Sequence, residues 1–182
     1  MQAESRFAHD DDAPIDWPGH IHQVLQRARI AQVAYVPDAG LARIIKLCEG
    51  DPAMRTIMLT AEQEGVGLLA GAWLGGERGV LLMQSSGVGN CVNALSLIRT
   101  CRFPLLALIA MRGEWGEFNP WQVPMGQTTR ASLELAGLIV HRVDEAAEAA
   151  ATVEAAARLA FDGTVGVAVL IGQRLIGAKS WR

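Results

Sequence analysis

Six short, mostly apolar segments recur along the 182-residue chain, and they constrain its fold more than any other feature. Rich in Val, Ile, Leu and Met, they are typical of strands buried on both faces. They span residues 32–36, 55–60, 79–84, 104–110, 138–143 and 164–171. Longer stretches with helical spacing separate them, at 20–30, 41–48, 62–74, 89–100, 129–136 and 144–159. Asp144 is the expected N-cap of the last helix. This alternation predicts an α/β fold: a single doubly wound domain whose six-stranded, mostly parallel sheet has helices on both faces.

The N-terminal segment has a different composition from the rest of the chain. Residues 1–16 hold one arginine and an acidic run at 10–12, where an export signal would carry basic residues and then an apolar stretch. We therefore predict a flexible tail over 1–16, not an export signal, followed by one domain over 17–182.

Charge, hydropathy and cysteine content exclude several classes of protein. The net charge is −3 with scattered Lys and Arg, so no basic stripe for nucleic acid is expected. The longest apolar runs, such as 165–171, are far shorter than the roughly 20 residues that span a membrane. Cys48, Cys91 and Cys101 are odd in number and lack C-x-x-C spacing, which indicates reduced thiols in a cytoplasm and no zinc site.

Ligands of doubly wound sheets bind beyond the carboxyl ends of the strands, so the segments after the strands are the candidate site. Residues 85–90 (SSGVGN) follow a predicted strand and open a helix. Gly87 and Gly89 match a dinucleotide fingerprint only in part, because Val92 stands where a third glycine belongs and no P-loop lysine follows. A tight strand-to-helix turn and a ligand contact remain equally good interpretations.

Two carboxylates stand at the start of the helix predicted over 62–74. Glu62 and Glu64 would both be favoured there by the helix dipole without any function. Helix positions two apart point about 200° apart, so we expect one of the two to face the sheet and be buried. Burial favours the protonated form of a carboxyl group, which suits general acid–base chemistry near neutral pH.

The segment 111–127 is unusually long for a connection and carries three aromatic residues, Trp115, Phe118 and Trp121. These form either the loop's own small core or a subunit interface, and the sequence favours neither. Arg112, just past a strand, is a candidate for binding an anionic substrate group, although a surface salt bridge is the commoner arrangement for an arginine.

Three stretches resemble the pyrimidine-binding domain of thiamine diphosphate-dependent 2-oxo acid decarboxylases. They are TAEQEGVGLLAG at 60–71, MQSSGVGN at 83–90 and PLLALIAMRGEWGEFNPWQVPMGQTT at 104–129. The likeness is strongest to the alpha subunit of sulfopyruvate decarboxylase and the N-terminal half of phosphonopyruvate decarboxylase. It includes a glutamate, Glu62, nine residues before Gly71, and a turn similar to MQNSGLGN in which Ser85 replaces an asparagine.

This resemblance implies that Glu62 hydrogen-bonds N1′ of the cofactor pyrimidine and so activates the thiazolium, while Glu64 is a solvated neighbour. Related sequences have a histidine near the position of Gln122. This chain has none there, so the resemblance identifies no proton donor to the product. The implied contacts are to the cofactor from Pro37, Gln84, Ser85 and Asn90, and to the substrate from Asp38, Arg112 and Gln122.

The resemblance further implies that this chain is half of an active site. Enzymes of this type bind the diphosphate through Mg²⁺ held by a G-D-G stretch and a later asparagine, and no G-D-G occurs here. We expect no metal ligands in this chain, Mg²⁺ bound by a separate diphosphate-binding subunit, and a heterotetramer with two copies of each chain. The expected substrate is a small anionic 2-oxo acid such as sulfopyruvate or phosphonopyruvate. A non-catalytic regulatory or binding protein that retains the fold is the alternative.

Overall fold

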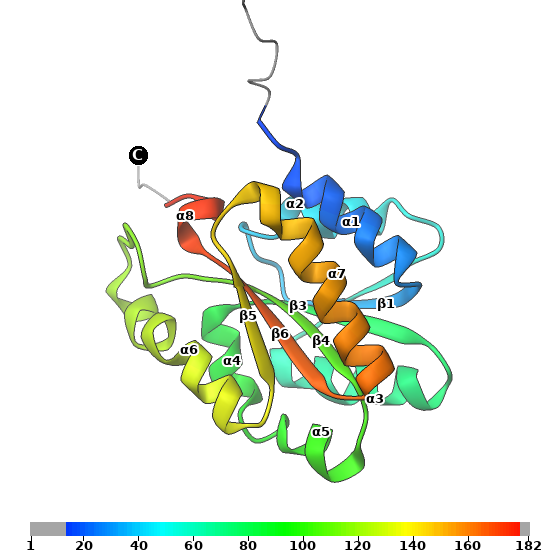
Figure 1. Ribbon diagram of the computed structural model, residues 1–182. Helices are drawn as coiled ribbons and strands as arrows, with labels where there is room; N and C mark the ends of the chain where they lie inside the picture. The colour runs from blue at the N-terminus through cyan, green and yellow to red at the C-terminus, as the bar shows by residue number, and fades with distance from the viewer. Residues whose placement is uncertain (1–13, 179–182) are drawn as a thin grey trace, which may run out of the picture.

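The computed structural model of the chain describes residues 14–178. Within them, six strands form one sheet in the order β2-β1-β3-β4-β6-β5, and every neighbouring pair is parallel (Figure 1). The strands are β1 (Ile30–Tyr35), β2 (Arg55–Met58), β3 (Arg78–Gln84), β4 (Leu105–Ala110), β5 (Ile139–Val143) and β6 (Gly166–Ile171). The predicted doubly wound α/β fold is confirmed, and its sheet is parallel throughout.

Helices cover both faces of this sheet (Figure 1). The first face carries α1 (Trp17–Arg27), α2 (Ala42–Glu49) and α7 (Ala146–Gly163), and the second carries α3 (Glu62–Leu74), α4 (Ser85–Cys91), α5 (Ser96–Cys101) and α6 (Val123–Leu135). Alternate side chains of each strand enter the two layers: in β3, Val80 packs with the first set of helices and Leu81 with the second. A 3₁₀ turn, η1 (Pro120–Gln122), and a short helix, α8 (Gln173–Ile176), complete the described elements.

Burial on both faces holds only for the centre of the sheet. Every residue of β4 and β6 is buried, as expected for strands between two helical layers. The prediction is wrong for the edge strands β2 and β5, which are partly exposed along most of their length. At the sheet edge only one neighbouring strand and part of a helical layer cover the residues.

Three local predictions also need correction. The helix expected over 89–100 is two helices, because α4 begins directly at Ser85 and a turn separates it from α5. Helix α6 begins at Val123, six residues before the expected start. Asp144 is not the N-cap of α7; that position is Glu145, while the Asp144 carboxylate accepts a 2.7 Å hydrogen bond from Nε of Arg142.

Asp16, the last residue of the predicted tail, is bonded to the first two helices. Asp16 caps α1 by accepting from the backbone N–H of Gly19 at 3.2 Å, and it also accepts from Nε of Arg43 on α2 at 2.9 Å. Residues 1–13 of the predicted tail lie outside the described residues.

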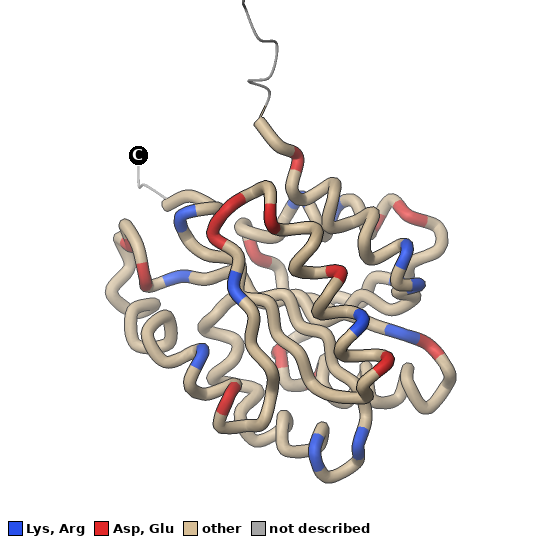
Figure 2. The backbone as a smooth tube through the Cα atoms, viewed as in Figure 1, with Lys and Arg blue, Asp and Glu red and all other residues tan. Residues whose placement is uncertain are grey.

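Basic and acidic residues are interspersed around the fold (Figure 2), in agreement with the scattered pattern in the sequence. Between residues 14 and 178, we find no helix whose length and apolar character would let it cross a bilayer.

Candidate functional site

The strand order reverses between β1 and β3, and this places two polar segments side by side. From β1 the chain crosses outward to β2, whereas from β3 it crosses the other way to β4, so the segments that follow β1 and β3 border one crevice. There Nε2 of Gln84 donates a 3.1 Å hydrogen bond to Oδ1 of Asp38. The other oxygen of Asp38 accepts from the backbone N–H of Gly40 at 2.9 Å, and Ser86 donates to Oε1 of Gln84 at 2.9 Å. Pro37 is exposed beside them and lines a shallow hollow.

The two carboxylates at the start of α3 have different environments. Glu62, the first residue of the helix, is only 8% exposed, while Glu64 is exposed. The Glu64 carboxylate accepts a 3.0 Å hydrogen bond from the backbone N–H of Thr60, two residues before the helix begins. The expectation that one of the pair is buried is confirmed, and the buried residue is Glu62.

The Glu62 carboxylate lies against the start of α4. Nδ2 of Asn90 donates a 2.7 Å hydrogen bond to its Oε2, and within residues 14–178 no group hydrogen-bonds Oε1. A Cβ atom at Gly87 would lie 2.5 Å from Cγ, Cδ and Oε1 of Glu62, so only a glycine leaves room for the carboxylate there. Burial, together with the Glu62 charge, raises the pKa of the neighbouring Cys91 thiol to about 12, so this thiol is protonated at neutral pH.

Arg112 is paired within the loop that follows β4. Its Nε and Nη2 donate to the two carboxylate oxygens of Glu117, each at 2.6 Å, and its guanidinium lies 5.6 Å from the centroid of the Phe118 ring. Both ionic side chains are almost entirely buried. The Arg112 guanidinium lowers the pKa of Glu117 to about 2, so both groups are charged at neutral pH. The commoner arrangement for an arginine, a salt bridge, is thus present, but it is buried and not at the surface.

Ser85 connects the start of α4 to the end of β4. It is fully buried, and its hydroxyl accepts a 3.1 Å hydrogen bond from the backbone N–H of Arg112. Its carbonyl accepts a weak bond from the hydroxyl of Thr129 at 3.4 Å. The Ser85 hydroxyl therefore joins the start of α4 to the segment after β4. Its predicted contact to a cofactor stays a prediction.

A cavity of about 180 Å³ brings two of the predicted substrate residues together. Segments 38–40, 110–112 and 176–178 line it, so Asp38 and Arg112 share its wall. This volume is roughly six times the ~30 Å³ that one water molecule occupies in the liquid, which is enough for a small molecule.

Gln122, the third predicted substrate residue, lies in η1. Its Oε1 is buried without a hydrogen-bond partner among the described residues. An unpaired buried acceptor costs free energy, so a water, ligand or partner group is expected to meet it. Nearby Trp121 is 83% exposed, so the alternative of a small core within the loop is wrong for this residue. The subunit interface remains a prediction.

One residue that organises this region escaped prediction from the sequence. Gln173, the first residue of α8, is 1% exposed, and its side chain hydrogen-bonds Glu114, Trp115 and Glu117. The signal that could have found it is its position directly after the strand β6 and Gly172, because the segment after each strand is a candidate site. Within the described part of the chain, no cluster of three or more His, Cys, Asp or Glu side chains could hold a metal ion.

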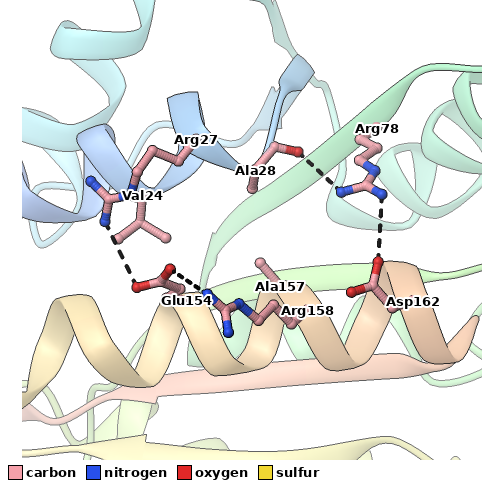
Figure 3. A pocket seen from close by; sticks show the side chains of 8 residues that line it. All are labelled: Val24, Arg27, Ala28, Arg78, Glu154, Ala157, Arg158 and Asp162. Carbon is pink, nitrogen blue, oxygen red and sulfur yellow. Dashed lines mark hydrogen bonds and ion pairs between the residues drawn. The ribbon is translucent and has the colours of Figure 1, made fainter.

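A second cavity, of about 320 Å³, lies between the end of α1, the start of β3 at Arg78, and α7 (Figure 3). Arginines from α1, β3 and α7 meet carboxylates of α7 there. The ion pairs join Arg158 to Glu154 at 3.0 Å, Arg78 to Asp162 at 3.6 Å and Arg27 to Glu154 at 3.9 Å. The pairs of Arg27 and Arg78 connect α1 and β3 to α7, whereas the pair of Arg158 lies within α7.

Comparisons with known proteins agree with the resemblance in the sequence. No protein-family model matches the chain. The alpha subunit of sulfopyruvate decarboxylase from Methanococcus maripaludis is 33% identical over 152 residues, which cover 83% of this chain and 91% of that subunit. Phosphonopyruvate decarboxylase from Streptomyces viridochromogenes is 39% identical over 108 residues, which cover 58% of this chain and 27% of that longer protein.

A solved structure shares the fold. A 2-oxoglutarate:ferredoxin oxidoreductase from Magnetococcus marinus superposes with a TM-score of 0.73 at 13% identity, over 88% of this chain and 29% of that chain. At this identity the likeness concerns the α/β architecture alone.

Proposed function

Because this chain belongs to the family of sulfopyruvate decarboxylase alpha subunits, we propose that it is the pyrimidine-binding half of a thiamine diphosphate-dependent decarboxylase. The substrate is a small anionic 2-oxo acid of the sulfopyruvate or phosphonopyruvate type, in keeping with the names of the relatives. The observation that carries the proposal is the setting of Glu62. Its buried carboxylate has one oxygen held by Asn90 and the other without a partner among residues 14–178.

These residues fit the pyrimidine end of the cofactor. A fixed carboxyl group with one unpaired oxygen suits a hydrogen bond to a ring nitrogen, and the missing side chain of Gly87 leaves the room that this carboxylate occupies. Glu62 would hold the pyrimidine N1′, with Pro37, Gln84, Ser85 and Asn90 around it. When bound, the cofactor supplies a thiazolium ring that accepts the electron pair released on loss of CO₂.

The proton chemistry assigned to Glu62 follows from its hydrogen bond. Because the Asn90 amide donates to Oε2, that oxygen must act as an acceptor, and a proton held by the carboxyl group resides on Oε1. Oε1 is therefore the atom that would share a proton with the pyrimidine. Glu64 is exposed and accepts from the backbone N–H of Thr60, so it takes no part in this exchange.

The substrate would bind near the cavity that Asp38 and Arg112 share, with Gln122 as the third contact. Arg112 reaches this cavity already paired with Glu117. The pair fixes the guanidinium in one orientation, so its contribution is a placed hydrogen-bond donor more than a free positive charge.

A second subunit would supply the diphosphate and Mg²⁺ site. The relative from Methanococcus maripaludis, which matches 83% of this chain, is named as a subunit. Phosphonopyruvate decarboxylase has most of its length outside the matched region. Two copies of each chain would give two equivalent sites by two-fold symmetry. We place this assembly in the cytoplasm. The alternative, a non-catalytic protein with this fold, gives no role to the almost fully buried Glu62 carboxylate that Asn90 holds.

The test combines calorimetry with an assay of CO₂ release. The purified chain is titrated with thiamine diphosphate and Mg²⁺, alone and after mixing with a candidate partner that carries G-D-G and a later asparagine. We expect the chain alone to be inactive and to bind at about millimolar concentration, because half the contacts must still immobilise the whole cofactor. Micromolar, Mg²⁺-dependent binding with turnover by the chain alone would refute the split site. No turnover of any 2-oxo acid by the mixture would refute the decarboxylase.

A further inference from the structure

Gln173 is a buried residue whose side chain is bonded entirely to one distant loop. It is 1% exposed and begins α8 directly after the central strand β6. Its Oε1 accepts from the backbone N–H groups of Glu114 at 3.1 Å and Trp115 at 3.0 Å, and its Nε2 donates to Oε2 of Glu117 at 2.9 Å. These partners lie 56 to 59 positions earlier in the chain.

The contact to Glu117 connects Gln173 to Arg112. Besides the two bonds from Arg112, the Glu117 carboxylate accepts from the backbone N–H of Gly113 at 3.1 Å and of Asn119 at 3.0 Å. Gln173 and these groups together fix the position of Glu117, and Glu117 in turn fixes the guanidinium that lines the cavity shared with Asp38. The backbone N–H of Gln173 adds a 2.8 Å bond to Oε1 of Glu114, whose carboxylate also pairs with Arg142.

Only a primary amide of this length satisfies all three partners of the side chain. Two backbone N–H groups require an acceptor, and the Glu117 carboxylate requires a donor. An ionised glutamate at position 173 would offer no donor and would place a second negative charge beside Glu117. A methionine would fill the same space and leave the two partly buried N–H groups of Glu114 and Trp115 without this acceptor.

We propose that Gln173 is a positioning residue for the substrate, because it holds the loop 111–119 and, through Glu117, sets where Arg112 lies in the cavity. This inference rests on the proposed function. It assigns Gln173 no contact with substrate; the residue acts through Glu117 and Arg112.

The first test uses Gln173→Met in the complete enzyme, assembled with its partner subunit. We expect the KM for the 2-oxo acid to rise about 10-fold while kcat changes less than about 3-fold, the pattern of lost binding that is uniform between ground and transition states. Hydrogen exchange of the Glu114 and Trp115 amides should rise at least about 10-fold, which is a measurement independent of activity. Gln23→Met makes the same chemical change at an exposed glutamine of α1 and should alter neither.

The results separate this inference from the proposed function. If wild type decarboxylates no 2-oxo acid, the proposed function is refuted. The exchange experiment still tests the tether, by which we mean the hydrogen bonds from the Gln173 side chain to the loop 111–119. If wild type is active and Gln173→Met exchanges faster without a change in KM, the positioning role is refuted. Unchanged exchange would refute the tether itself.

A second variant, Gln173→Glu, covers the case in which Gln173→Met does not fold. The introduced carboxyl group should raise KM at neutral pH, where it repels Glu117. As the pH falls and this group binds a proton, it regains a donor toward Glu117, so the ratio of its KM to that of wild type should return toward one. The charged groups around the introduced carboxyl group are Glu114, Glu117, Arg112 and Arg142. Wild type contains all four, so dividing the KM of the variant by that of wild type corrects for their titration. A ratio independent of pH would overturn the role assigned to the donor.

Discussion

The side-chain amide of Asn90 donates a 2.7 Å hydrogen bond to Oε2 of Glu62, across 28 positions of sequence. The two residues belong to the first turn of α3 and the last turn of α4, which pack together on the second face of the sheet. The bond selects which carboxylate oxygen remains available. Orientation of the Glu62 carboxyl group by the Asn90 amide is thus a property of the packing between these two helices.

Removing the amide should reduce turnover without unfolding the chain. A hydrogen bond to a charged group contributes about 1.5–3 kcal/mol, so Asn90→Ala is expected to lower kcat of the assembled enzyme by roughly 10- to 100-fold. Asn93→Ala changes an exposed asparagine in the turn after α4 and serves as the control. Wild-type kcat in Asn90→Ala would show that the Glu62 orientation does not depend on this bond.

Glu62→Gln and Glu64→Gln should behave in opposite ways. The first replaces the group that shares a proton, and its amide can still accept from Asn90, so we expect normal assembly and at least about a 100-fold loss of decarboxylation. The second removes an exposed charge that accepts from the backbone N–H of Thr60, and it should cost stability of about 1 kcal/mol or less with little change in turnover. Steady-state CO₂ release and thermal unfolding distinguish the two. A silent Glu62→Gln beside an inactive Glu64→Gln would move the assignment by two residues.

The architecture could be predicted from the sequence because burial between two helical layers leaves a direct record in the residues. The segments at 104–110 and 164–171 are apolar because both faces of β4 and β6 are covered. The start of α4 could not be located in the same way. Gly87 and Gly89 are weak helix formers, and only the folded structure shows that Glu62 occupies the space of a side chain at Gly87.

The candidate site residues could be named one by one from the sequence, but their contacts with one another could not. Several of the predicted residues meet each other in pairs: Glu62 with Asn90, Gln84 with Asp38, and Ser85 with Arg112. Such pairings depend on strand order and on the exact start of each helix, which local patterns do not encode. Glu117 illustrates the limit, because only the folded loop shows that its carboxylate neutralises Arg112.

The stability contributed by Glu117 should depend on pH in a defined window. Its pKa falls from an ordinary value of 4.5 to about 2, chiefly through the hydrogen bonds from Arg112. A carboxyl group whose pKa is lower in the folded state stabilises fully above its unfolded value and loses that contribution as the pH falls. Glu117→Gln should therefore lower the free energy of unfolding by about 3–5 kcal/mol at pH 7, because Arg112 loses its partner. This difference should shrink as the pH drops from 4.5 toward 2.

Urea unfolding of the isolated chain at several pH values measures this difference. Glu134→Gln is the matched control, since Glu134 forms an exposed pair with Arg130 one helical turn away. Exposed pairs contribute about 0–1 kcal/mol, so the control should differ little from wild type at any pH. A Glu117→Gln difference that stays constant from pH 7 to pH 3 would contradict the assignment.

Alanine in place of Gly87 should lower turnover, whereas alanine in place of Gly67 should raise the stability of the chain. At Gly87, the added methyl group would lie 2.5 Å from Oε1 of Glu62, so Gly87→Ala must displace the carboxylate and is expected to lower turnover at least about 10-fold. At Gly67, on the open side of α3, an added methyl group would meet no atom within 4 Å. Alanine there should raise the free energy of unfolding of the isolated chain by about 0.5–1 kcal/mol, because glycine in a helix interior is unfavourable by that amount.

Thermal unfolding of both variants, with turnover of the assembled enzyme for Gly87→Ala, provides the comparison. Full activity in Gly87→Ala would mean that the Glu62 carboxylate does not need the space that this glycine leaves.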